Sequence, residues 1–106
     1  MLMVVDATVA LKINAIFPEE QREPALRILE AYPGRAGTRL QLAMLKNSDG
    51  DVDKLADQVR LAEIDYRDVL ALAEYPRQLR TAAGEVTDEM QRADRQDYES
   101  WLQGDQ

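Results

Sequence analysis

The chain has 106 residues, of which 45% are hydrophobic, so it is long enough for one folded domain and too apolar for a disordered segment. It contains no cysteine and no histidine, which excludes disulfides, thiolate metal sites and the usual nucleophile–base dyads. The net charge is −7, and it is uneven: residues 1–46 carry +1 and residues 47–106 carry −8. Binding of nucleic acid is therefore not expected. No stretch approaches the ~20 apolar residues of a membrane helix, and we expect a cytoplasmic protein.

Helical periodicity between proline and glycine breaks predicts five main helices along the chain. The first covers about 6–17, and the second ends near residue 32, with Pro24 in its first turn. The third covers about 38–46 and is apolar on most sides, which is typical of a helix buried among neighbours. The fourth and longest covers about 51–75, and the last covers about 87–102. Residues 77–80 add at most one further turn.

These elements predict an all-α fold, a four- to five-helix bundle with one long central helix at about 51–75. All of residues 1–106 are expected to form a single domain. The apolar stripe of the last helix is thin, because only Met90, Ala93 and Trp101 contribute to it. We therefore expect residues 87–106 to be a loosely packed C-terminal helix.

The long helix has apolar residues on two faces. One face is a seam with alternating steps of three and four residues, as in helices that pack side by side; its members are Val52, Leu55, Val59, Ala62, Tyr66, Val69 and Ala73. Three large aliphatic residues, Leu61, Ile64 and Leu72, are expected opposite this seam, among charged neighbours. Either the terminal helices of the chain cover them, or they form a partner interface.

Two groups of carboxylates raise the possibility of a hard metal site. Glu19, Glu20 and Glu23 lie at the start of one helix, and Asp65 and Asp68 lie one turn apart on another. The two groups resemble the acidic pairs with which all-α nucleotide pyrophosphatases hold Mg²⁺. That resemblance implies phosphate chemistry with Mg²⁺ as the cofactor. The alternative is that these acids are solvated helix faces, with no metal and no cofactor.

Arg35 and Arg39 flank a glycine turn that leads into the third helix. Free backbone N–H groups at a helix start, together with arginine, can hold an anion. The segment lacks the Lys-Ser/Thr end of a phosphate-binding loop, so a plain turn is the alternative to an anion site.

A segment of the chain resembles a group of short uncharacterised bacterial proteins that are all helical. The resemblance covers about residues 38–76 and rests on the third helix and on the run DYRDVLALAEYP, which begins at Asp65. It implies a bacterial helical domain and no particular activity.

Together, these features favour a small non-enzymatic domain that binds protein through helix–helix contacts. Its partner would be a second copy, in a homodimer, or another bacterial protein for which it serves as an adaptor. The enzyme alternative is the Mg²⁺-dependent hydrolase described above. A third alternative is an acidic mimic that blocks the basic binding site of another protein.

Overall fold

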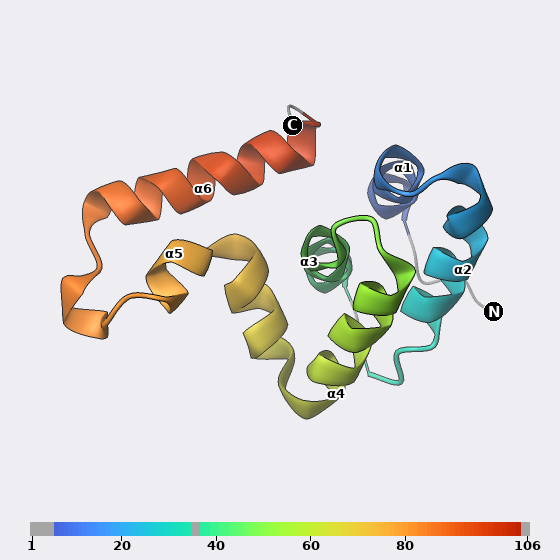
Figure 1. Cartoon of the computed structure of the whole chain (residues 1–106), viewed down its shortest axis with the longest axis horizontal. Coiled ribbons are helices and arrows are strands. Elements are labelled where there is room, and N and C mark those ends of the chain that lie inside the picture. The colour runs from blue at the N-terminus through green and yellow to red at the C-terminus, as the bar shows by residue number, and fades with distance from the viewer. Residues whose placement is uncertain (1–5, 35–36, 105–106) are drawn as a thin grey trace.

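In the computed structural model, which describes residues 6–34 and 37–104, the chain folds into helices, and those residues include no strand (Figure 1). The all-α prediction and the long central helix are therefore confirmed. The elements are α1 (Ala7–Ile16), α2 (Glu19–Glu30), α3 (Thr38–Ser48), α4 (Val52–Glu74), α5 (Pro76–Leu79), a 3-10 turn η1 (Ala83–Glu85) and α6 (Asp88–Gln103).

Side-chain caps start three of the helices where the sequence places short polar residues. Asp6 accepts a hydrogen bond from the backbone N–H of Val9 at 3.1 Å, and Thr87 accepts one from Met90 at 3.1 Å. Asp51 accepts bonds from the first backbone N–H groups of α4. These bonds satisfy donors that have no partner within the helix, which fixes where each helix begins.

One prediction for α2 is wrong. Pro24 lies inside this helix and not in its first turn, because the helix begins at Glu19, directly after Pro18. Pro18 supplies the extended backbone that precedes a helix start. Pro24 lacks the N–H that the helix would otherwise use there, so it is a local weak point in α2.

The core surrounds α3. All six residues from Leu40 to Leu45 are buried, including Gln41, so α3 is enclosed on several sides, as its apolar sequence predicts. α4 packs along it and α1 also contacts it, while α2 packs against α4 and α1. The largest fully buried apolar side chains of the core are Val9, Leu29, Met44, Leu45, Leu55 and Val69.

α4 is bent at Asp65, whose backbone is extended (φ −159°, ψ 102°) within an otherwise helical run. The bend interrupts the predicted seam. Leu55, Val59 and Ala62 are buried before it and Val69 and Ala73 after it, but Tyr66 is 49% exposed and not part of the core.

α6 forms an arm that runs past α5 and brings its C-terminal end close to α1 and α3 (Figure 1). The molecule is elongated as a result, with extents of 44 × 31 × 21 Å. Asp94 and Trp101 are the buried residues of α6, while Met90 and Ala93 of the predicted stripe are half-buried. Across the described ranges, every helix is too short or too polar to cross a membrane.

Candidate functional site

The structure does not gather the predicted metal ligands into a cluster. Within residues 6–34 and 37–104, no group of three or more acidic side chains is arranged to hold a metal ion. Glu23 forms an ion pair with Arg27 on the surface of α2, at 3.0 Å. Asp65 is bonded to Arg67 at the bend of α4. The geometry therefore adds no support to the Mg²⁺ reading of Glu19, Glu20, Glu23, Asp65 and Asp68.

The structure describes only one of the two arginines of the predicted anion site. Arg35 lies outside the described residues. Arg39 forms a two-pronged ion pair with Glu74 of α4, with both nitrogen–oxygen distances at 2.8 Å. The pair ties α3 to α4. Anion binding by Arg39 stays a prediction.

The three residues of the predicted partner interface differ in their exposure. Leu61 is half-buried and packs against the core, and Leu72 is half-buried as well. Ile64 is 82% exposed, the highest value among the exposed large apolar residues in the described ranges. The bend at Asp65 separates them, because it turns the helix between Ile64 and Leu72. Ile64 is thus the exposed centre of this region, and Tyr66 lies beside it.

The bend itself is held by Asp65. Its carboxylate accepts a hydrogen bond from the backbone N–H of Arg67 at 3.0 Å, so it caps the second half of α4. The guanidinium of Arg67 also donates to both carboxylate oxygens, at 2.9 and 3.0 Å. These bonds lower the pKa of Asp65 and keep it charged. Residues 64–66 therefore form a fixed outward corner, which we call the α4 corner.

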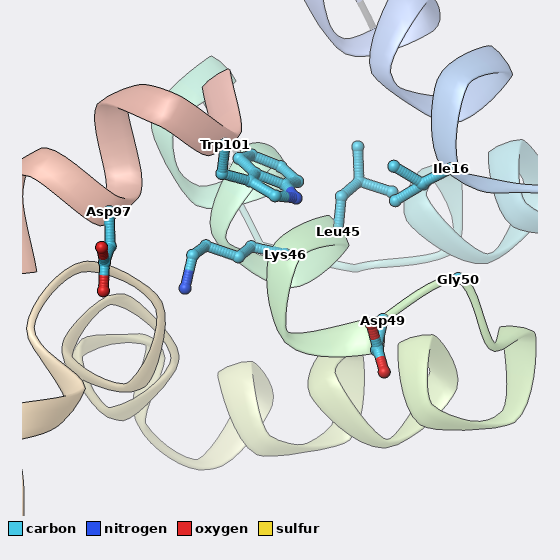
Figure 2. Close-up of a pocket in the computed structure, with 7 residues that line it drawn as sticks. All are labelled: Ile16, Leu45, Lys46, Asp49, Gly50, Asp97 and Trp101. Carbon is cyan, nitrogen blue, oxygen red and sulfur yellow. The ribbon is translucent and has the colours of Figure 1, made fainter. Parts of the chain in front are cut away.

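A pocket lies where α1, the end of α3 and α6 meet, and sequence reasoning did not predict it. Its volume is about 440 Å³, within the range of small-molecule sites. Figure 2 shows the lining residues: Ile16, Leu45, Lys46, Asp49, Gly50, Asp97 and Trp101. Gly50 has φ +75°, and a Cβ there would lie 2.7 Å from the carbonyl oxygen of Ile16, so only glycine allows this close approach.

Lys46 and Trp101 are the largest polar and aromatic side chains that line this pocket. Figure 2 shows Lys46 extending below the Trp101 ring, with its ammonium group toward Asp97. The Lys46 Nζ lies 6.0 Å from the centre of the Tyr98 ring, at the outer limit of a cation–π contact. Burial lowers the pKa of Lys46, since water can no longer fully solvate its charge.

Lys12 of α1 contacts Trp101, one of the residues that line the pocket. It is buried, its Nζ lies 4.4 Å from the centre of the Trp101 ring, and the same Nζ donates a hydrogen bond to the Trp101 carbonyl oxygen. The sequence held a signal for this role. Lys12 shares the apolar stripe of Val9, Ile13 and Ile16, where a charged residue needs a specific partner.

A second buried charge fixes the middle of α6. Asp94 is 1% exposed, and its carboxylate accepts hydrogen bonds from the backbone and side chain of both Arg77 and Gln78, at 3.1–3.3 Å. Burial by itself raises the pKa of Asp94, but these bonds outweigh it and lower the pKa overall. Asp94 therefore caps α5 from the neighbouring helix and sets the path of α6.

Comparison of the chain with known protein families, with curated proteins and with solved structures found no match. The functional argument therefore rests on the α4 corner and on the pocket.

Proposed function

We propose that this chain is a non-catalytic protein-interaction domain whose α4 corner binds a basic, amphipathic helix of another protein. The observation that carries the proposal is the 82% exposure of Ile64 in a rigid corner of the longest helix. The sequence predicts either a self-associating domain or an adaptor, and this proposal selects the adaptor. It also includes the acidic-mimic alternative, because the proposed partner is basic.

The apolar part of the proposed interface is Ile64 with Tyr66. The two residues flank Asp65 at the bend of α4, and both are exposed. A partner that covers Ile64 would gain about 1.5–3 kcal/mol from that side chain alone. Tyr66, at 49% exposure, adds an aromatic ring of the kind that protein interfaces favour.

The polar part is a pair of free carboxylates around the corner. Glu63 and Asp68 are exposed and form no ion pair within the described ranges, whereas Asp57 and Asp65 are each neutralised by an arginine. Two unpaired acids beside an exposed aliphatic side chain favour a partner that presents an apolar stripe flanked by lysine or arginine.

The same charges argue against self-association through this corner. A two-fold homodimer places identical patches against each other, so Glu63 and Asp68 would face their own copies. Like charges brought together in an interface are costly, and the chain as a whole already carries −7. A different, basic chain meets the corner without this repulsion.

The test is a titration of the chain with a synthetic amphipathic helix of leucine and lysine. Isothermal titration calorimetry measures the affinity. Ile64→Asp removes the apolar anchor and adds a negative charge. Leu79→Asp is the matched control, because Leu79 is also exposed, at 53%, but lies on α5. Simple charge attraction would make both variants bind the cationic peptide at least as tightly as the wild type.

The proposal predicts that Ile64→Asp binds the peptide at least about tenfold more weakly than Leu79→Asp, because the peptide has to cover the exposed Ile64 side chain. Equal affinities for the two variants would mean that the peptide senses only net charge, and the α4 corner would not be a docking site. Circular dichroism of both variants checks that the fold is retained.

A further inference from the structure

The pocket between α1, α3 and α6 presents two hydrogen-bond donors without acceptors. Within residues 6–34 and 37–104, the ammonium group of Lys46 forms no hydrogen bond or ion pair, and the indole Nε1 of Trp101 donates no hydrogen bond. No fully buried side-chain nitrogen in those ranges lacks a partner, so this Nε1 must be reachable from the pocket space. Figure 2 shows it on the edge of the ring nearest Leu45.

The nearby carboxylates form no ion pair with Lys46 within the described residues, although the charges of Asp97 and Asp94 partly offset the effect of burial on its pKa. Asp97 bonds to the Arg77 guanidinium at 2.7 Å, and Asp94 already accepts four hydrogen bonds from Arg77 and Gln78. Asp49 lies on the other side of the pocket in Figure 2. Burial lowers the pKa of Lys46 by more than the carboxylates of Asp97 and Asp94 raise it, so the half-buried ammonium is only partly compensated. The Lys46 ammonium in this pocket thus lacks a hydrogen-bond acceptor among the described residues.

We propose that this pocket binds a small organic monocarboxylate. The ligand carboxylate accepts from the Lys46 ammonium, the one cationic side chain among the described residues that line the pocket. The body of the ligand lies against the apolar wall formed by Ile16, Leu45 and the Trp101 ring. The volume of about 440 Å³ accommodates an acid of modest size.

The charges around the pocket favour a monoanion over a phosphate. A phosphate group carries about −1.5 to −2 charges at neutral pH, and only one unpaired cation, Lys46, faces the space. Asp49 and Asp97 also line the pocket, so the second charge of a phosphate would meet repulsion without compensation. A single carboxylate matches the single ammonium.

The chain offers a direct readout, because Trp101 is its only tryptophan. Fluorescence of the full-length protein is titrated with hexanoate and benzoate, and with the neutral amides of the same acids. The single indole N–H signal is followed by NMR in parallel. The proposal predicts saturable changes with the acids only, and a shift of the indole N–H signal as the ligand packs against the Trp101 ring.

Lys46→Met keeps the length of the side chain and removes the charge, so it should weaken acid binding about tenfold or more. Lys54→Met is the control, because Lys54 is exposed on α4 and does not line the pocket. Absence of a saturable change, equal binding of acids and amides, or unaltered binding by a folded Lys46→Met protein would each overturn the proposal.

The carboxylate has two sources, a free acid or the C-terminus of a peptide. A short acetylated peptide that ends in leucine, compared with its C-terminal amide, separates them. If hexanoate binds and the peptide does not, the pocket is a site for free acids. If both bind, the pocket also accepts the C-termini of chains. The pocket is independent of the α4 corner, since about 18 Å of helix separates Val52 from Ile64.

Discussion

The ammonium group of Lys12 in α1 lies 4.4 Å from the centre of the Trp101 ring in α6 and donates a hydrogen bond to the carbonyl oxygen of the same residue. Two residues 89 positions apart thus join the first and last helices. The contact combines a cation–π interaction with a bond to a carbonyl near the C-terminal end of α6, where a positive charge is favourable. It holds the free end of the α6 arm against the core.

Lys12→Met should loosen this end of α6 while keeping its aliphatic packing. The expected loss in the free energy of unfolding is about 1 kcal/mol, from one hydrogen bond and one cation–π contact. Trp101→Ala should cost about 3 kcal/mol, because it removes a large buried ring. Denaturant unfolding measures both, and hydrogen exchange should show faster exchange concentrated in α6. Uniformly faster exchange across α3 and α6 would contradict the tether.

Asp94→Ala should detach α5 from α6. The four donors that now bond to this carboxylate would lose their acceptor, at a cost of about 2–4 kcal/mol. Asp94→Asn keeps one acceptor oxygen and should cost less. The comparison by denaturant unfolding, with hydrogen exchange at residues 76–79, isolates the contribution of the carboxylate.

The same residue predicts a dependence of stability on pH. Because the folded-state pKa of Asp94 is lower than its usual value of 3.8, the charged carboxylate stabilises the fold above that value. This contribution should be lost as the pH falls from about 3.8 through the lower folded-state pKa. The difference in unfolding free energy between the wild type and Asp94→Asn should therefore shrink in this acidic window. A difference that stays constant would show that the charge is not involved.

Asp65→Ala should weaken the second half of α4. It removes a helix cap and the Arg67 pair, and caps of this kind contribute about 1 kcal/mol. Asp68, on the same turn, forms no hydrogen bond or ion pair with the residues that the structure describes, so Asp68→Ala should change the unfolding free energy by less than about 0.5 kcal/mol. Thermal and denaturant unfolding compare the two. Equal effects would mean that the bend is set by packing and not by the cap.

Mg²⁺ or Mn²⁺ at about 10 mM should leave the melting temperature unchanged, since a ligand stabilises a fold only when it binds the folded state. The prediction follows because two of the candidate carboxylates already form separate ion pairs, Glu23 with Arg27 and Asp65 with Arg67. A rise in Tm that disappears in both Glu20→Gln and Asp65→Asn would support the hydrolase alternative instead.

The sequence predicts the helices well because apolar spacing and caps are local signals. The bend in α4 escaped prediction, since apolar residues continue at steps of three and four through Asp65, although an aspartate before a new apolar run is itself a helix-start signal. Tyr66 was consequently assigned to the core. The pocket was also missed, because Lys46 and Trp101 meet only through the tertiary path of α6. The path of α6 depends on the contacts of two buried charged residues, Lys12 and Asp94. Hydrophobic periodicity in the sequence does not predict such contacts.

Light scattering coupled to size-exclusion chromatography tests the central proposal, that the α4 corner binds a different, basic chain. The mass of the chain alone and its mass with the leucine–lysine helix are measured at about 0.15 M salt, where surface charges are partly screened. We predict a monomer of 12.0 kDa alone and a one-to-one complex with the peptide, which Ile64→Asp fails to form. A homodimer that Ile64→Asp converts to a monomer would contradict the proposal and make a second copy of the chain the partner of this corner.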